Sequence, residues 1–226
     1  MALISEQDRK HLQEAFDRQL QAEVTLVLFT YAEDSPAFAE CQFCADMEQL
    51  LTEVAGLSAK IDLIVYDFEK DVEIRERYGV RRAPALVILG DKDYGIRYYG
   101  IPSGYEAQSL IEDIIDVSAR DSGLSAETQE WLQQLDSPVH LQVFVTPTCP
   151  YCPAAVRLAH RLALASDYIE ADMVEALEFP ELARKYGVYG VPRVVINEDY
   201  YFEGALPEKQ YVAEIRKALL GLTPAR

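Results

Sequence analysis

Apolar residues along the chain form two kinds of pattern, which together predict alternating strands and helices. Short apolar runs typical of buried strands lie at 24–29, 61–66, 84–89, 94–99, 139–145, 168–174, 193–197 and 199–203. Apolar residues spaced three or four positions apart predict helices at 3–20, 43–54, 72–78, 107–118, 125–135, 150–166, 178–186 and 207–220. The stretch 31–40, which contains Pro36, is expected to be a loop.

The predicted elements follow one order in both halves of the chain: helix, strand, helix, strand, helix, strand, strand, helix. Crossover helices between the first three strands, followed by a hairpin, are typical of a mixed four-stranded sheet with helices on both faces. The polar segment 120–123, which ends in glycine, separates the halves. We therefore expect an α/β protein with two tandem domains, residues 1–120 and residues 121–226.

A constant offset of 108 residues relates the two halves. Six pairs of identical residues stand at this offset: Cys41 and Cys149, Cys44 and Cys152, Tyr78 and Tyr186, Gly79 and Gly187, Val80 and Val188, and Pro84 and Pro192. Matches of this kind at one offset indicate an internal duplication. Each half therefore carries one C-x-x-C motif and one matching proline.

The overall charge narrows the classes of partner. The 226 residues include 38 acids and 21 bases, which gives a net charge of −17 at pH 7. Such a chain is not expected to bind nucleic acid or anionic membrane surfaces. It has no apolar run of about 18 residues, and charges are spread through residues 1–21, so we expect neither a transmembrane helix nor a secretory signal. The expected location is the cytoplasm.

All four cysteines lie in the motifs Cys41-Gln42-Phe43-Cys44 and Cys149-Pro150-Tyr151-Cys152. In a reducing compartment such pairs indicate redox chemistry, zinc binding or a structural bond. Ribbon-type zinc sites place their pairs about 15–20 residues apart, whereas these pairs are 108 apart. A disulfide that closes so short a loop also restricts the unfolded chain little. The pattern favours redox-active dithiols, which carry electrons themselves and need no bound cofactor or metal.

A Gly-Val-x-x-x-Pro segment ends at Pro84 in the first half and at Pro192 in the second. The order strand, C-x-x-C, helix, and later this segment before a strand pair, resembles the thioredoxin fold. Two such units in one chain resemble the protein disulfide oxidoreductases of thermophilic archaea and bacteria, which are glutaredoxin-like tandem proteins. The resemblance implies an enzyme that reduces, oxidises or isomerises protein or peptide disulfides. It also implies a thioredoxin-reductase-like flavoprotein as the source of electrons.

Within this resemblance, Cys149 is expected to be the main nucleophile. We expect it at the N-cap of a helix with Pro150 at the first helical position, where a missing N–H costs nothing. The helix dipole there favours the thiolate. Cys152 is expected to be more buried and to resolve the mixed disulfide by attacking the Cys149 sulfur. Tyr151, between the cysteines, is expected to face the substrate.

Cys41 and Cys44 are expected to repeat this chemistry in a more acidic setting. Glu40 precedes the first cysteine and Asp46 follows the second. Because nearby carboxylates disfavour a thiolate, we expect Cys41 to be less reactive than Cys149. Thioredoxins carry tryptophan before the first active cysteine, and this chain departs from that pattern in both motifs.

The two prolines are expected to follow cis peptide bonds, because cis bonds are essentially confined to proline and mark constrained turns. The residues before them, Ala83 and Val191, would then offer backbone N–H and C=O groups beside the dithiols. An extended peptide substrate could pair with these groups as an added strand. Ala83, Pro84, Val191 and Pro192 are therefore the expected substrate-binding residues.

No buried proton acceptor is evident from the pattern, because no carboxylate lies in either strand that leads to a dithiol. Asp62, Glu170 and Asp172 are candidates by position alone. His160, two turns beyond Cys152, is expected to be a partly exposed helix residue.

Two other functions stay open at this point. Tandem thioredoxin-like units also resemble the N-terminal part of the flavoprotein that reduces peroxiredoxins, which would make the chain an electron-transfer module. A non-catalytic, peptide-binding thioredoxin-like protein would use the groove beside the prolines. The sequence does not determine the direction of exchange, nor whether the two dithiols pass electrons to each other.

Overall fold

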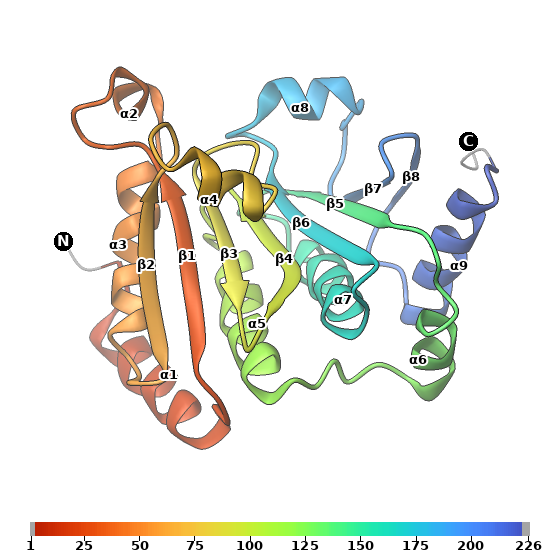
Figure 1. The fold of residues 1–226 in the computed structure, drawn as a ribbon, viewed down its shortest axis with the longest axis horizontal. Helices are drawn as coiled ribbons and strands as arrows, with labels where there is room; N and C mark the ends of the chain where they lie inside the picture. The colour runs from red at the N-terminus through yellow and green to blue at the C-terminus, as the bar shows by residue number, and fades with distance from the viewer. Residues whose placement is uncertain (1–2, 223–226) are drawn as a thin grey trace.

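Residues 3–222, the part of the chain that the computed structural model describes, form an α/β structure around an eight-stranded sheet (Figure 1). The strand order is β2-β1-β3-β4-β6-β5-β7-β8. The strands are β1 (Val24–Thr30), β2 (Ile61–Asp67), β3 (Ala85–Leu89), β4 (Asp93–Tyr99), β5 (Val139–Val145), β6 (Ile169–Glu175), β7 (Arg193–Ile196) and β8 (Tyr200–Glu203). The expected domain limits at residues 1 and 226 lie outside the described range.

Each half of the sheet has the same pairing. β1 is parallel to β2 and antiparallel to β3, which is antiparallel to β4. β5 pairs in the same way with β6 and β7, and β7 pairs with β8. The mixed four-stranded sheet expected in each half is confirmed.

The two sheets are joined edge to edge, which the repeat did not predict. β4 and β6 pair in parallel, from Ile96 with Ala171 to Tyr99 with Val174. This pairing satisfies the backbone groups of two strands that would otherwise be exposed edges. It also brings the loops that follow these strands together, where the N–H of Ile101 donates to the carboxylate of Glu178.

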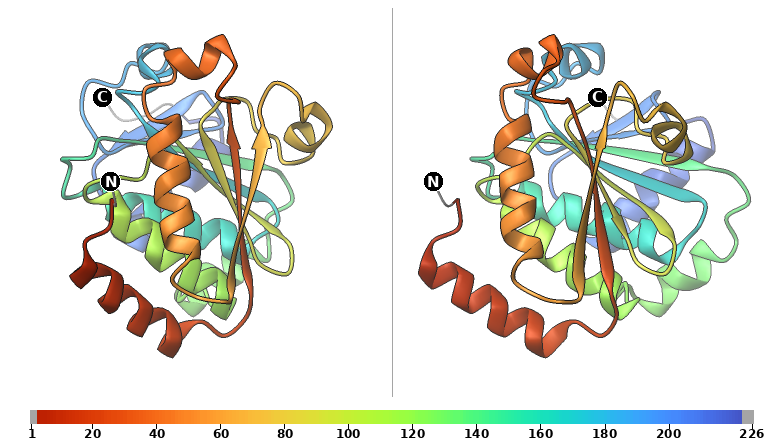
Figure 2. Two further views of the ribbon diagram at one scale, coloured as in Figure 1. Left: turned by 90° about the vertical axis from the view of Figure 1, so that its left-hand side faces the viewer. Right: turned by 60° about the vertical axis from the view of Figure 1, so that its left-hand side comes forward.

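Helices cover both faces of the sheet (Figure 1, Figure 2). One core contains side chains from α1 (Glu6–Gln19), α3 (Cys44–Ala55), α5 (Glu106–Ala119), α6 (Ala126–Leu132), α7 (Cys152–Ala165) and α9 (Glu208–Leu219). The other core lies under the short helices α4 (Val72–Arg77) and α8 (Pro180–Lys185). β1 alternates between them: Leu26 and Leu28 belong to the first core, Val27 and Phe29 to the second. Burial on both faces explains the continuous apolar run from Leu26 to Phe29 in this strand.

Two expectations about the first half were wrong. The run 61–66 was expected to be a buried strand, but β2 lies at the edge of the sheet, and Ile64 and Val65 are 41 % and 42 % exposed. The segment 31–40 was expected to be a loop, but it contains the short helix α2 (Pro36–Glu40). This helix starts because Ser35 accepts a hydrogen bond from the N–H of Ala37, and because Pro36 suits the first helical turn.

A buried ionic cluster links α5 of the first half to α7 of the second. Arg157 donates hydrogen bonds to Asp113 and Asp116, and the hydroxyl of Tyr98 also donates to Asp113. His160 lies in the same cluster, with Nδ1 2.5 Å from Asp113 Oδ2. The expectation that His160 is partly exposed was wrong, because its side chain is completely buried. Burial lowers the pKa of His160 to about 3, so its ring is neutral and donates Nδ1–H to Asp113.

Candidate active site

The second dithiol lies in the loop between β5 and α7. Cys149 and Cys152 form a disulfide with their Cα atoms 5.5 Å apart. The helix begins at Cys152, with Pro153 in its first turn and Tyr151 as the preceding cap residue. The sequence suggested Cys149 as the N-cap and Pro150 as the first helical residue, and both expectations were wrong. Pro153 decides the start, because a proline is tolerated where the backbone N–H has no helical partner.

The segment before Pro192 lies against this dithiol. The Val191–Pro192 peptide bond is cis, and the Sγ atom of Cys149 is 3.7 Å from the carbonyl oxygen of Val191. Cys152 is completely buried, whereas Cys149 is 7 % exposed. Tyr151 is 70 % exposed. The structure thus places Cys149, Cys152 and Val191 in one site, with Tyr151 at its rim.

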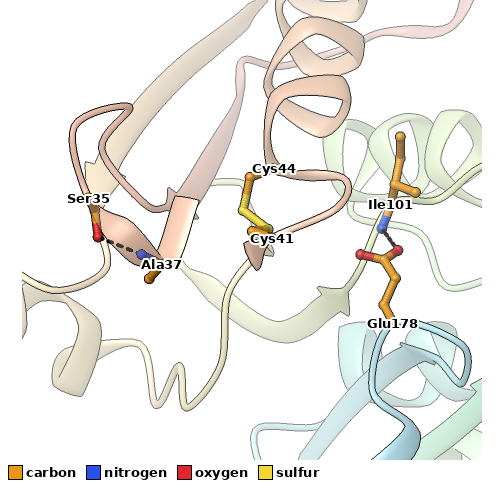
Figure 3. Close-up of a disulfide and its surroundings, with 6 residues drawn as sticks. All are labelled: Ser35, Ala37, Cys41, Cys44, Ile101 and Glu178. Carbon is orange, nitrogen blue, oxygen red and sulfur yellow. Dashed lines mark hydrogen bonds between the residues drawn. A yellow bond between two sulfur atoms is a disulfide. The ribbon is translucent and has the colours of Figure 1, made fainter. Parts of the chain in front are cut away.

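The first dithiol has the same arrangement in a different setting (Figure 3). Cys41 and Cys44 form a disulfide with a Cα–Cα distance of 5.6 Å, and α3 begins at Cys44. Cys41 ends α2, and its N–H is within hydrogen-bond distance of the carbonyls of Ala37 and Phe38. Cys44 is completely buried and Cys41 is half-buried.

A cavity of about 300 Å³ opens beside Cys41. Ala83 and Pro84 line it together with Cys41, and the Ala83–Pro84 peptide bond is cis. The two residues singled out from the first half of the sequence therefore lie beside the first dithiol. Their counterparts, Val191 and Pro192, lie beside the second.

The three carboxylates that were candidates by position do not face a dithiol. Ala171 and Met173 belong to the same core as Cys152, so Asp172 between them points to the opposite face of the sheet. There its Oδ2 lies 2.6 Å from Nε2 of His140. Glu170 and Asp62 alternate in the same way and are exposed.

A buried acid that sequence reasoning missed is Glu106, the first residue of α5. It is 1 % exposed; its Oε2 accepts a hydrogen bond from Ser109 at 2.6 Å, and its Oε1 has no hydrogen-bond partner among the described residues. Burial raises the pKa of Glu106 to about 7. The preceding residue, Tyr105, donates its N–H to the carbonyl of Pro147, in the loop that leads to Cys149. This contact holds the start of α5 against the loop that leads to Cys149.

A second acid that was missed is Glu178, in the loop between β6 and α8. Its side chain is half-buried and lines the same cavity as Cys41 and Pro84. Its carboxylate accepts a hydrogen bond from the N–H of Ile101 at 2.7 Å (Figure 3). Burial raises the pKa of Glu178 to about 7.

One of these acids left a signal in the sequence. Glu106 stands four residues before Leu110 and eight before Ile114, so the helical period places it on the buried stripe of α5. An acid on an apolar stripe indicates a buried carboxylate, because such residues are otherwise exposed. Glu178 lies in a loop and left no such signal.

Similarity to a solved structure identifies the family. A protein disulfide oxidoreductase from Aeropyrum pernix K1 covers 98 % of this chain and 96 % of its own, with 33 % identical residues and a TM-score of 0.87. The chain belongs to the protein disulfide oxidoreductases. The thioredoxin-domain family model matches residues 139–217. Thioredoxin from Methanocaldococcus jannaschii is 38 % identical over 84 residues, which are 37 % of this chain and 99 % of that protein.

The oxidoreductase is also similar to one part of several larger proteins. The NTD_N/C domain of the alkylhydroperoxide reductase AhpF from Enterococcus faecalis is 28 % identical, with a TM-score of 0.84, over 94 % of this chain and 99 % of that domain. An NADH dehydrogenase from Bacillus subtilis is 22 % identical over 172 residues, or 75 % of this chain. The chain spans 31 % of the length of that relative.

The family and the two C-x-x-C motifs establish the chemistry. The protein is a thiol–disulfide oxidoreductase that works by dithiol–disulfide exchange. Between residues 3 and 222, none of the helices has the length and apolar character needed to cross a membrane.

Proposed function

We propose that the oxidoreductase acts on protein disulfides mainly through Cys149 and Cys152, with Cys149 as the attacking sulfur. The observation that carries this proposal is the 3.7 Å approach of the Cys149 sulfur to the carbonyl of Val191. A substrate segment that pairs with the backbone of Val191 would bring its own disulfide next to Cys149. Cys152 is buried behind it and is suited to the second step.

The exchange has two steps. The Cys149 thiolate attacks one sulfur of the substrate disulfide, so that a mixed disulfide forms and the other substrate sulfur leaves as a thiolate. Cys152 then attacks the Cys149 sulfur, which restores the bond between the two cysteines and releases the second substrate thiol. Cys41 and Cys44 carry out the same chemistry as a second centre.

Tyr151 and Tyr189 are proposed to contact the substrate around Cys149. Tyr189 lies in the segment before Pro192 and is 98 % exposed, and Tyr151 is 70 % exposed. Exposed aromatic rings in the segments that carry Cys149 and Val191 favour substrates with apolar side chains near their cysteine, because both surfaces lose contact with water. Replacement of Tyr189 should therefore weaken substrate binding more than it slows the chemical steps.

Glu106 is proposed as the proton acceptor of the second dithiol. Cys152 is completely buried, so solvent cannot easily take its proton when it attacks. A carboxyl group with a pKa of about 7 can accept and return a proton near neutral pH. The hydrogen bond between Tyr105 and Pro147 keeps the start of α5 next to this loop.

Insulin reduction with dithiothreitol as the electron donor tests the main proposal. The Cys149→Ser/Cys152→Ser protein should lose most of the activity, whereas the Cys41→Ser/Cys44→Ser protein should keep most of it. The opposite ranking would refute Cys149 as the main nucleophile. Refolding of a scrambled disulfide substrate by the wild type and both variants would show whether isomerisation is part of the function.

A second candidate function is electron transfer from a flavoprotein reductase to a peroxiredoxin. It is favoured by the similarity to the NTD_N/C domain of AhpF along nearly the whole of both chains. The test combines the protein with a thioredoxin-reductase-like flavoprotein, NAD(P)H, a peroxiredoxin and peroxide. Peroxide-dependent oxidation of NAD(P)H that requires the protein would support this function, and its absence would exclude it for these partners.

The proposed units are residues 1–120 and 121–226, descended from one ancestral domain. The matching strand pairings of the two halves support this division. The proposed location is the cytoplasm, where thiols are kept reduced. Cell fractionation with an antibody against the protein would test the location.

A further inference from the structure

The first dithiol shares its cavity with an acid from the other half of the chain. Cys41 and Pro84 come from the first half, and Glu178 comes from the loop after β6 in the second half. The pairing of β4 with β6 brings these segments together. Figure 3 shows the disulfide at the start of α3 and the carboxylate of Glu178 beside Ile101. The cavity therefore exists only because the two halves are joined.

The position of the Glu178 carboxylate is set by its neighbours. It accepts the N–H of Ile101, and the N–H of the preceding Gly100 donates to the carbonyl of Pro84 at 3.1 Å. Gly100 has a φ of +87°, and a Cβ atom there would lie 2.6 Å from Oε1 of Glu178. Glycine is thus required at residue 100 for the carboxylate to reach this place. These contacts tie the acid to the same proline segment that lies beside Cys41.

Among the titratable groups that line the cavity, Glu178 is the one suited to accept a proton. No lysine, arginine or histidine is among the described residues that line it. Glu40 lines it from α2 but is exposed, so water screens its charge. Burial raises the pKa of Tyr31, which keeps that phenol protonated near neutral pH. Glu175 lies behind, where its Oε2 accepts the N–H of Glu178 at 2.6 Å.

We propose that Glu178 accepts the proton that Cys41 loses when the reduced first dithiol becomes reactive. The proposal rests on the proposed exchange chemistry of Cys41 and Cys44. It follows from the shared cavity, because a Cys41 thiolate and an ionised Glu178 would place two negative charges in a space without a cation. Moving the proton from sulfur to carboxylate leaves a single negative charge there.

Proton and electron transfer balance in this reaction. The Cys41 S–H bond breaks, the proton passes to a carboxylate oxygen of Glu178, and the electron pair stays on sulfur. The thiolate forms a bond to one substrate sulfur while the substrate S–S bond breaks, and the leaving thiolate takes the proton from Glu178. Cys44 then displaces the second substrate thiol from Cys41 and transfers its own proton to it. Two electrons and two protons pass from the dithiol to the substrate.

Alkylation of Cys41 tests the proposal in the reduced Cys149→Ser/Cys152→Ser protein. Iodoacetamide is used between pH 5 and pH 10, and the labelled peptide is measured by mass spectrometry. The rate should rise with pH in two steps, because Cys41 and Glu178 titrate as a coupled pair. With Glu178→Gln added, the rate should rise in one step. The variant keeps an oxygen that can accept the Ile101 N–H, so the fold is preserved.

Glu181→Gln is the matched control, because Glu181 lies three residues further along the chain and its side chain is 92 % exposed. This variant should keep both steps. A single step in the parent protein, or two steps in the Glu178→Gln protein, would overturn the proposal. The same proteins are then assayed for insulin reduction, where Glu178→Gln should be slower by roughly 100-fold, at the lower end of the range for acid–base catalysis.

The two assays separate this proposal from the proposed function. If the parent protein does not reduce insulin through Cys41 and Cys44, the exchange role of this pair fails. The alkylation profile still measures the coupling of Cys41 to Glu178, since iodoacetamide needs no docking surface.

Discussion

Replacement of Glu106 by glutamine should stabilise the oxidoreductase at alkaline pH and slow its second dithiol. Burial raises the pKa of Glu106 to about 7, whereas the same group in an unfolded chain has its ordinary pKa of 4.5. Below pH 4.5 the carboxyl group is protonated in both states and contributes no pH dependence. Between pH 4.5 and pH 7 the folded state keeps a proton that the unfolded state has lost, so stability falls as pH rises. Above pH 7 the full cost is present.

The size of this cost follows from the shift in pKa. A difference of about 2.5 units at 1.36 kcal/mol per unit corresponds to about 3 kcal/mol. Glutamine does not ionise. The difference in free energy of unfolding between the variant and the wild type should therefore change by about 3 kcal/mol from pH 4 to pH 8, in favour of the variant. For a chain of this length this corresponds to a rise in relative Tm of roughly 6–12 °C.

Urea unfolding of the oxidised proteins at pH 4, 6 and 8 measures this effect. Any constant difference from the changed hydrogen bonding to Ser109 cancels when the two ends of the pH range are compared. Glu130→Gln is the matched control, because it removes the same charge from an exposed position. A difference for Glu106→Gln that is the same at pH 4 and pH 8, within about 1 kcal/mol, would refute the reasoning.

Substitutions at three other contacts should also have measurable effects. Arg157→Met leaves the buried Asp113 without a cationic partner, since His160 is neutral, and should cost about 3–5 kcal/mol in urea unfolding. Arg184→Met, at an exposed pair, should cost less than about 1 kcal/mol. Gly104→Ala places a Cβ atom in steric overlap with the carbonyl oxygen of Pro147. It should lower the free energy of unfolding by more than about 1–2 kcal/mol and slow insulin reduction, and an unchanged Tm would contradict this. Tyr189→Ser should raise KM for an apolar disulfide peptide about tenfold at similar kcat, in line with the burial energy of an aromatic contact; an unchanged KM would exclude it from the substrate surface.

The redox centres could be predicted from the sequence because they depend on local spacing and on the repeat. Two cysteines separated by two residues, placed after a strand and at a helix, come together whatever the rest of the chain does. The prolines 43 residues further on follow from the fold of each half, in which β5 pairs with β7 just after Pro192. The start of α7 was misplaced by two residues because Pro150 and Pro153 are both acceptable at a helix start.

Other features required the tertiary structure, because they depend on contacts between the halves. The parallel pairing of β4 with β6 joins two edge strands, and an edge strand has the same local pattern whether it is paired or exposed. That pairing moves Glu178 beside Cys41, 137 positions earlier in the chain, and it sets α5 against α7, where His160 is buried. The acids proposed to act with the dithiols could therefore not be predicted from the sequence of either half alone. The sequence by itself determined the two dithiols and the duplicated α/β fold through short-range periodicity, whereas the environment of each sulfur was decided by long-range packing, which sets burial and hence pKa.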